Sequence, residues 1–376
     1  MLTDESRLID FPSLEGRIYL NSAAEGIPPR DVRNALLDYF SDKQLGMDGR
    51  ERHAAQWDAA KALLGQFYGL TPDEVSICSC SSEAYNLAAM AMRLQPGDEV
   101  VINDLDFPAG ATPWLQEGCP ATVKLWKNRD GALDVDDLKS LLTARTRLVT
   151  VSLVSFFNGF LIPLRDVIQT VRQNSTALLA LDVTQALGRI PLELDGVDLI
   201  VSSTHKWILA SHGGGLVGVP KAREAELTVP AGGWFNLKDA FGAERFERAV
   251  SKPGAASFTV GMPNYPAVYA IRAGLEYIAR TGVPEIAAAT RPLVLHCLDE
   301  LSRMPVQLLT PNHPASVAGI LAFRHKDAER IHQRLHSRNI HVMSHAGRLR
   351  IAIHGYNTTA DIETFLSELR EALTSV

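Results

Sequence analysis

The chain has few cysteines, and they do not follow the patterns that bind metals or build disulfide frameworks. Its 376 residues include only Cys78, Cys80, Cys119 and Cys297, with no C-x-x-C spacing and no histidine partners at metal-ligand intervals. Disulfide scaffolds and zinc sites need denser or more regular cysteines. The sequence therefore predicts a reduced, cytoplasmic protein without a structural metal.

Long hydrophobic runs and an excess of positive charge are also missing. No apolar segment approaches the length of a membrane span, and the first five residues show no basic or apolar region typical of a signal peptide. The net charge is -6 and the isoelectric point is near 6.0. Nucleic acid and anionic membranes are therefore not expected as partners.

The composition, 46% hydrophobic and 21% charged, is that of an ordinary globular enzyme. From about residue 71 to 220, short apolar runs alternate with amphipathic stretches, as in parallel sheets with crossover helices. The expected strands are residues 75–77, 99–102, 122–125, 148–153, 178–182, 199–201 and 215–219.

Beyond about residue 260 helix signals dominate. Helices are expected at residues 266–278, 291–301, 328–337 and 360–373, with strands at 317–323 and 349–353. The length allows one large domain and a smaller one. We expect an N-terminal arm over residues 1–15, a large domain over 16–260 and a small α+β domain over 261–376.

An acid and a lysine stand at the ends of two expected strands. The apolar run 178–181 ends in Asp182, and the run 197–201 leads into Ser-Thr-His-Lys-Trp at 203–207, followed by glycines at 213–215. A lysine can hold an aldehyde as a Schiff base, and a carboxylate can keep a pyridine nitrogen protonated. The pair Asp182 and Lys206 therefore predicts a pyridoxal phosphate site.

Simpler interpretations exist for each residue alone. Lys206 could be a surface lysine, Asp182 a helix N-cap and His205 a packed polar side chain. A helix expected over residues 82–91, with a serine N-cap, follows a strand through Ser81 and Ser82. Such a helix N-terminus favours an anion, so this turn is a candidate phosphate site, although serine caps are common.

Several segments, in this order along the chain, resemble the class V aminotransferases, pyridoxal phosphate enzymes of fold type I. They are Tyr-Leu-Asn-Ser-Ala-Ala at 19–24, Ser-Ser-Glu-Ala at 81–84, Asp-Val-Thr-Gln-Ala at 182–186, Ser-Thr-His-Lys at 203–206 and Arg-Ile-Ala-Ile-His-Gly-Tyr-Asn at 350–357. The family includes cysteine desulfurases, selenocysteine lyases, kynureninases, isopenicillin-epimerase-like proteins and transaminases. The resemblance implies an α/β fold with a mostly parallel sheet, helices on both faces, a smaller α+β C-terminal domain and a homodimer with active sites near the subunit interface.

The resemblance also implies roles by position. Lys206 would be the Schiff-base lysine and Asp182 the partner of the ring nitrogen. The remaining cofactor contacts would be Gln185 at the ring hydroxyl, Phe107 stacked on the ring, Ser155 or Asn158 as a further ring contact, and Ser81, Ser82, Ser203 and His205 at the phosphate. Arg350 would bind the substrate carboxylate as a bidentate fork. Further substrate-side candidates are Asn21, Glu25, His53 and Trp234.

Some of these positions have ordinary structural alternatives, and three features depart from the family. Phe107 could be core and Arg350 a paired strand residue. Cysteine desulfurases stack a histidine where this chain has Phe107, and carry a nucleophilic cysteine where residues 324–349 contain none. Persulfide chemistry needs that thiolate, so a desulfurase is disfavoured. Met262 replaces a threonine that binds the cofactor phosphate of the neighbouring subunit, with Ser257 or Thr259 as possible substitutes.

We therefore expect a pyridoxal phosphate enzyme that acts at the α-amino group and Cα of a small amino acid. An aminotransferase is the first expectation, while a β-eliminating carbon–sulfur lyase and an epimerase would use the same residues. A regulator that only binds the cofactor is disfavoured, because about 15 residues precede the family match, too few for a DNA-binding module.

Overall fold

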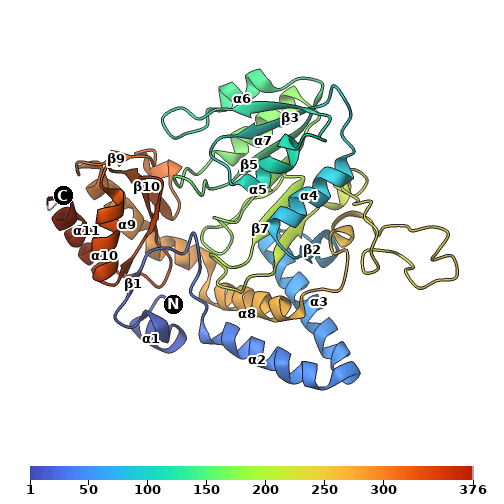
Figure 1. Ribbon diagram of the computed structural model, residues 1–376, viewed down its shortest axis with the longest axis horizontal. Helices are drawn as coiled ribbons and strands as arrows, with labels where there is room; N and C mark the ends of the chain where they lie inside the picture. The colour runs from blue at the N-terminus through green and yellow to red at the C-terminus, as the bar shows by residue number, and fades with distance from the viewer. Residues whose placement is uncertain (375–376) are drawn as a thin grey trace.

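A seven-stranded sheet forms the centre of the molecule in the computed structural model, which describes residues 1–374 (Figure 1). Its spatial order is β2-β8-β7-β6-β5-β3-β4. The bounds are β2 Val75–Cys78, β3 Glu99–Asn103, β4 Thr122–Trp126, β5 Thr146–Ser152, β6 Leu178–Asp182, β7 Leu199–Ser203 and β8 Gly215–Gly218. Neighbours from β7 to β4 are parallel, and β8 is antiparallel to β7 and β2. The expected α/β fold with a mostly parallel sheet is confirmed.

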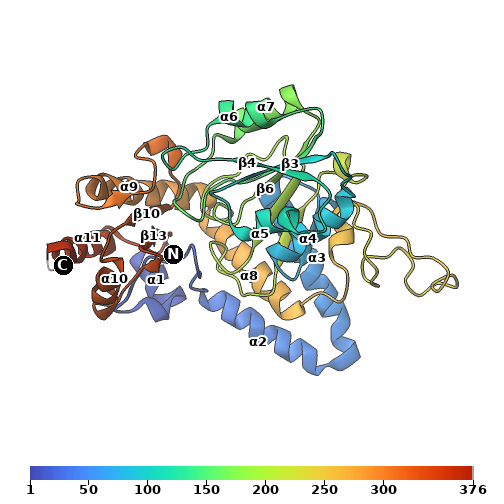
Figure 2. The same cartoon turned by 45° about the horizontal axis from the view of Figure 1, so that its top comes forward.

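Helices cover both faces of this sheet (Figure 2). Strand β6 shows why its sequence is apolar throughout: Leu179 and Leu181 belong to one core, while Leu178 and Ala180 belong to the other. Successive strand side chains point to opposite faces, so a sheet covered on both sides needs apolar residues at every position. The first core includes residues of α3 (Arg50–Tyr68), α6 (Val135–Leu141), α7 (Leu164–Asn174) and α8 (Tyr265–Thr281), and the second includes α4 (Ser81–Met92) and α5 (Pro108–Ala111).

A second, antiparallel sheet of order β12-β13-β10-β9 lies toward the C-terminus. Its strands are β9 Gln307–Leu308, β10 Ile320–Arg324, β12 Met343–His345 and β13 Arg348–Ala352, accompanied by α9 Val283–Ser302, α10 Ala328–Ser337 and α11 Thr359–Thr374. Helix α9 begins eight residues before the expected start at 291 and continues through Pro292. Proline normally marks a first turn, which is why the sequence suggested a later start.

The N-terminal segment belongs to both parts of the molecule. It consists of α1 (Asp4–Asp10), β1 (Ile18–Tyr19) and α2 (Arg30–Gln44). Strand β1 pairs in parallel with β11 (Ile340–His341), whereas α2 packs on α8. The division of the chain at residues 15 and 260 stays a prediction.

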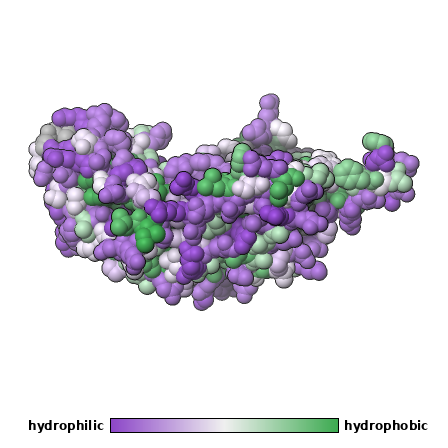
Figure 3. All heavy atoms as spheres, turned by 90° about the horizontal axis from the view of Figure 1, so that it is seen from below, coloured by the Kyte–Doolittle hydropathy of each residue, from purple (hydrophilic) through white to green (hydrophobic). Residues whose placement is uncertain are grey.

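The face of the molecule shown in Figure 3 is largely hydrophilic, with hydrophobic residues in separate patches. Between the buried Asn236 and residue 253, a loop extends from the body at the right of Figure 1 and carries the exposed Phe241 and Phe246. On α2, Leu37 and Phe40 are also exposed. Within residues 1–374, no helix has the length and apolar character to cross a membrane.

Candidate active site

Asp182 and Lys206 lie at the same edge of the central sheet. Asp182 ends β6, whose register places it beside Val201 of the parallel strand β7, and Lys206 follows three residues after the end of β7. The carboxyl ends of parallel strands are where open α/β sheets bind ligands. The structure therefore brings together the two residues that the sequence marked as most informative.

Burial of this site increases the uncharged fraction of the Lys206 amine. Burial lowers the pKa of Lys206 to about 8; the charge of Asp182 opposes this shift and that of Arg350 adds to it. Burial raises the pKa of Asp182, and this is opposed by an N–H of Thr184 at 2.8 Å and by Lys206. The Lys206 Nζ lies 5.3 Å from the centroid of the Phe107 ring.

Hydrogen bonds from distant segments hold the turn around Lys206. The carbonyl of His205 accepts the N–H of Gly26 at 2.8 Å. The indole N–H of Trp207 donates to Oε1 of Gln185 at 2.6 Å, and Nε2 of Gln185 donates to the carbonyl of Ala23 at 3.1 Å. Gln185 thus ties the lysine turn to the N-terminal segment, and its contact with a ring hydroxyl stays a prediction.

The expected phosphate turn lies at the N-terminus of α4, but its cap is not a serine. Cys80 is the N-cap, and its Sγ accepts the N–H of Glu83 at 3.4 Å, while Ser81 and Ser82 are the first helical residues. Sulfur is a weak acceptor, so this cap competes little with an anion for the helix N–H groups. Cysteine is not among the preferred N-caps, which explains why the sequence pointed to serine.

Within residues 1–374, buried polar atoms without a hydrogen-bond partner occur at several places, and some of them belong to residues predicted to bind a ligand. They include Ser203 Oγ at the end of β7, Asn21 Oδ1 and Arg350 Nε. Buried polar groups are normally hydrogen-bonded, so such atoms call for a ligand or water. The half-buried His205 beside them has its pKa lowered to about 4, mainly by burial, which keeps its ring neutral. A hydroxyl, an amide, a guanidinium, an amine and a carboxylate fit the phosphate, ring and substrate of a pyridoxal phosphate site.

Arg350 is not paired across its sheet with an acid. It lies in β13 opposite Ala322 of β10 and Met343 of β12. Its guanidinium donates to the carbonyl of Phe156 at 2.8 Å, and burial lowers its pKa to about 10. The remaining N–H groups are therefore available for a carboxylate.

Phe107 is open to solvent rather than part of the core. It is 43% exposed, and its ring meets that of Phe156 edge-on at 5.1 Å. In contrast, Ser155 and Asn158 are buried and bound to the main chain: Ser155 Oγ donates to the carbonyl of Leu105 at 2.8 Å, and Asn158 Nδ2 to that of Gly131 at 2.7 Å. A ring contact from either residue stays a prediction.

The other substrate-side candidates fall into two groups. Asn21 forms a β-bridge with Ala352, two residues after Arg350, and the charge of Glu25 raises the pKa of Lys206. His53 is buried on α3, where Nδ1 contacts the hydroxyl of Tyr269 at 2.9 Å. Trp234 lies just before the extended loop and packs against Phe235 and Phe241. The contacts of His53 and Trp234 are therefore those of residues that stabilise the fold.

Glu25, His205 and His212 each place one potential metal-ligand atom within 4.8 Å of the others. The two imidazole rings are stacked, with centroids 4.4 Å apart and planes at 16°. Nitrogen lone pairs lie in the ring plane, so nearly parallel stacked rings do not aim at one ion. We therefore treat this cluster as a stacked pair with Glu25 hydrogen-bonded to His212 at 3.1 Å.

Two hydroxyls that could replace the missing threonine are already engaged. Ser257 Oγ donates to the carbonyl of Gly254 at 2.6 Å, and Thr259 Oγ1 donates to that of Ile77 at 2.8 Å. Met262 itself is 48% exposed. The substitution at Met262 thus has no evident replacement in these two neighbours.

One acidic residue of this region had no role in the sequence interpretation. Asp106, just before Phe107, accepts the N–H of Ser152 at 2.7 Å through its carboxylate. Burial of that carboxyl raises its pKa to about 7. Its sequence signal was only its place between an expected strand and a candidate ring-stacking residue.

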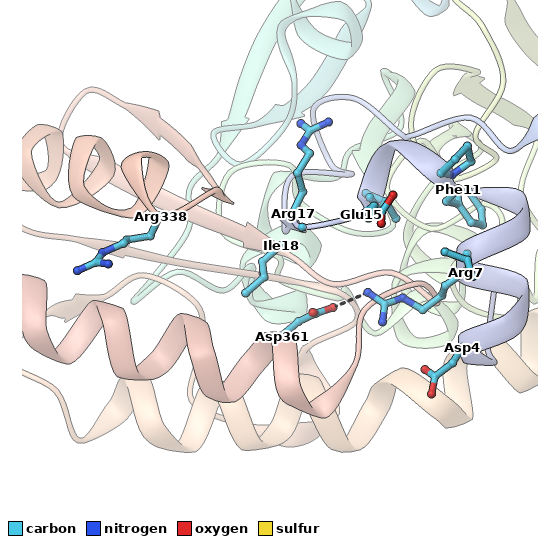
Figure 4. Close-up of a pocket in the computed structure, with 12 residues that line it drawn as sticks. Asp4, Arg7, Phe11, Glu15, Arg17, Ile18, Arg338 and Asp361 are labelled. Atoms are coloured by element: carbon cyan, nitrogen blue, oxygen red, sulfur yellow. Dashed lines mark hydrogen bonds and ion pairs between the residues drawn. The ribbon is translucent and has the colours of Figure 1, made fainter.

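A different cavity, of about 480 Å³, lies beside α1 and includes Arg17, Arg338 and Asp361 in its lining (Figure 4). Arg7 pairs with Asp361 at 3.1 Å, whereas the guanidinium groups of Arg17 and Arg338 point in different directions. None of the predicted catalytic residues lines this cavity.

The sheet topology, with Lys206 and Asp182 at adjacent strand ends, defines a pyridoxal phosphate enzyme of fold type I. The chain matches Aminotransferase class-V over residues 18–365 and belongs to that family. This confirms the resemblance, and with it the cofactor.

Relatives and solved structures cover nearly the whole chain. An uncharacterised aminotransferase of Bacillus subtilis is 24% identical over 361 residues, 96% of this chain and 95% of that protein. A cysteine desulfurase of Synechococcus elongatus is 26% identical over 97% of this chain, which spans 63% of that protein. A cysteine desulfurase structure from Thermococcus onnurineus has a TM-score of 0.90 at 20% identity, covering 100% of this chain and 99% of its own. A cystine C–S lyase with its product cysteine persulfide has a TM-score of 0.86 at 20% identity, covering 96% and 99%.

Proposed function

We propose that this pyridoxal phosphate enzyme is an aminotransferase that accepts the amino group of a small α-amino acid. One observation carries the proposal: Lys206, with its lowered pKa, lies within the electrostatic influence of both Asp182 and the incompletely paired Arg350. An amine, an acid for the ring nitrogen and a carboxylate-binding guanidinium are the groups that an amino acid substrate requires.

When bound, pyridoxal phosphate supplies an aldehyde for the substrate amine and a protonated ring that draws electron density from Cα. Lys206 Nζ, about half uncharged at its pKa of about 8, takes and returns the Cα proton as a general base and acid. Asp182 keeps the ring nitrogen protonated and compensates its charge. Arg350 holds the α-carboxylate, and Asn21 and Glu25 face the substrate.

The remaining cofactor contacts follow from the same proposal. Ser203, His205 and the α4 N-terminus with Ser81 and Ser82 bind the phosphate. Phe107 covers one face of the ring. Gln185 and one of Ser155 and Asn158 complete the ring contacts in this proposal, although all three already have internal hydrogen bonds.

A carbon–sulfur lyase is the second candidate, because a cystine C–S lyase is among the similar structures and would need the same lysine, acid and arginine. Cysteine desulfurase activity is disfavoured. Residues 324–349 contain no cysteine, and Cys78 and Cys297 are buried thiols whose pKa values burial raises. An epimerase remains a third outcome of the same proton transfers.

We also infer a homodimer with its active sites near the subunit interface. The exposed apolar side chains Leu37 and Phe40 on α2, and Phe246 on the extended loop, support an interface with a second copy. Such groups gain free energy by burial, at about 25 cal/mol per Å² of apolar surface.

The test begins with the purified holoenzyme. Borohydride reduction should attach the cofactor mass to the peptide containing Lys206, and Lys206→Ala should show neither this label nor turnover. Single amino acids are then supplied with a 2-oxo acid. A new amino acid formed from the 2-oxo acid, in a ratio of one to one with the donor consumed, establishes the aminotransferase.

The alternatives give different products. Release of ammonia, a thiol and a keto acid without added 2-oxo acid would replace the aminotransferase by the lyase. Inversion at Cα without any keto acid would indicate the epimerase. Full turnover by Lys206→Ala would overturn the assignment of the site itself.

A further inference from the structure

Asp106 lies where three parallel strands of the central sheet end. It follows β3 by three residues, and its carboxylate accepts the N–H of Ser152, the last residue of β5, at 2.7 Å. Ser152 is in turn the register partner of Asp182 at the end of β6. One side chain therefore connects the loop after β3 to the strand end that neighbours Asp182.

Other hydrogen bonds also hold the loop that carries Asp106, and among them Asp104 Oδ1 accepts the N–H of Asn128 at 2.8 Å. The N–H of Leu105 donates to Oδ1 of Asn103 at 3.0 Å, and its carbonyl accepts Ser155 Oγ at 2.8 Å. The next residue but one is Phe107, whose ring lies 5.3 Å from Lys206 Nζ. The orientation of Phe107 thus depends on how this loop is fixed to β5.

The carboxyl of Asp106 faces a small group of buried polar side chains. A Cβ at Gly110 would lie 3.7 Å from Asp106 Oδ2, 3.5 Å from Thr150 Oγ1 and 3.6 Å from Tyr85 Cζ, so the three side chains surround one point. The titratable groups that act on one another here come from the β3 loop, β6, α4, α3 and the turn after β7, and are Asp106, Asp182, Tyr85, Tyr68 and Lys206.

Two carboxylates at one buried sheet edge repel each other when both are ionised. Asp182 has the positive charge of Lys206 nearby, and a cofactor ring nitrogen would stabilise its charge further. Asp106 has only neutral partners, which are the amide and hydroxyl of Ser152 and the side chain of Asn103. The proton is therefore expected on Asp106. Burial, with the charge of Asp182 adding to its effect, raises the pKa of Asp106 to about 7.

We propose that Asp106 is a positioning residue that, as a neutral carboxylic acid, fixes the Phe107 loop to the strand end beside Asp182. Asp106 thereby aligns Phe107, on the face of the cofactor ring, with Asp182, at the ring nitrogen. Because it is neutral, it adds no second negative charge. This inference rests on the proposed roles of Phe107 and Asp182.

The variants Asp106→Asn and Asp106→Ala distinguish the effect of the hydrogen bond to Ser152 from the effect of a charge at this position. Asparagine keeps an acceptor for the N–H of Ser152 and is neutral, so cofactor affinity and the circular dichroism of the bound cofactor should stay close to wild type. Alanine leaves that N–H without its acceptor, and cofactor affinity should fall about tenfold, with a weaker dichroic band. Asp104→Asn is the matched control, because Asp104 is exposed in the same loop and accepts the N–H of Asn128 at 2.8 Å.

A second measurement uses the protein without cofactor and does not depend on the proposed function. Because the pKa of Asp106 is raised in the folded state, the folded protein binds the proton more tightly than the unfolded chain, and wild type loses stability as pH rises from about 4 to about 7. Asp106→Asn lacks this loss, so its Tm relative to wild type should rise between pH 5 and pH 8.

Asparagine behaving like alanine, or alanine binding the cofactor as tightly as wild type, would overturn the positioning role. A Tm difference that does not change with pH would overturn the neutral acid. If borohydride reduction of the wild-type holoenzyme does not label Lys206, the proposed function is wrong. The pH dependence of Tm would then still test whether Asp106 is protonated.

Discussion

At the scale of single residues, the proposed chemistry depends on the uncharged fraction of one amine, that of Lys206. Burial lowers the pKa of Lys206 from 10.5 to about 8. At pH 8 about half of the Lys206 amines are then uncharged, against well under 1% for an ordinary lysine. The pKa of Lys206 is the result of burial and of neighbouring charges that act in opposite directions. The contribution of each charge can therefore be tested by removing it.

We predict that the rate of acylation of the Lys206 amine in the cofactor-free protein has its pH midpoint near 8. Mass spectrometry of the peptide that contains Lys206 measures this rate. Asp182→Asn removes a charge that raises this pKa, so the midpoint should move lower. Arg350→Gln removes a charge that lowers it, so the midpoint should move higher. Each shift should be about half a pH unit or more. A midpoint near 10, or shifts of the same sign, would contradict this account.

The sequence was informative about these residues where the chemistry requires a particular residue type. Lys206, Asp182 and Arg350 were proposed from the sequence because few other residue types can supply an amine, a carboxylate and a bidentate guanidinium, and their roles stay predictions. Gln185 illustrates what could not be predicted: both ends of its amide bind segments far away in sequence. Asp106 was missed for the same reason, since its partner Ser152 is 46 residues away and no local pattern marks the pair.

At the scale of elements, the central strands could be predicted almost to the residue. Strand β6 has the expected bounds, 178–182, because a strand buried on both faces is a short apolar run between polar residues. Helices α2 and α3 were not predicted, and α2 has only one buried residue, Val32. Its position depends on packing against α8, which is more than 200 residues further along the chain.

The contact between the N-terminal segment and the lysine turn gives a prediction at this scale. A Cβ at Gly26 would lie 1.9 Å from the carbonyl oxygen of Lys206, a main-chain atom that cannot move without displacing the turn. Gly26→Ala should therefore weaken cofactor binding and destabilise the protein by about 1–3 kcal/mol, measured by cofactor titration and denaturant unfolding. Gly118→Ala is the control, because a Cβ there meets nothing within 4 Å. Equal behaviour of the two variants would show that the turn tolerates displacement.

At the scale of the whole molecule, Arg189 links the central sheet region to the C-terminal sheet. It lies in the segment between β6 and β7 and is 1% exposed. Its guanidinium donates to the carbonyl of Ile353 at 2.9 Å and to that of Ala318 at 3.3 Å, which flank β13 and β10. Burial lowers its pKa to about 9, so the charge is held at a cost that main-chain acceptors offset.

We predict that Arg189→Ala destabilises the protein by about 3–5 kcal/mol, because it leaves two buried carbonyls unpaired and a cavity beside Gly319, whose added Cβ would lie 2.6 Å from Arg189 Nε. Arg165→Ala is the matched control: Arg165 is 84% exposed and pairs with Glu193, so its removal should cost less than about 1 kcal/mol. Denaturant unfolding followed by tryptophan fluorescence and far-ultraviolet dichroism measures both.

The shape of the unfolding curve tests the division of the chain as well. If Arg189 couples two separately folded parts, the two probes should report one transition in wild type and two in Arg189→Ala, since Trp207 beside Arg189 lies on the central sheet side. A single, shifted transition in the variant would mean that the large and small parts unfold together for other reasons, such as the pairing of β1 with β11. A free energy of unfolding unchanged from wild type would show that Arg189 does not hold the two sheets together.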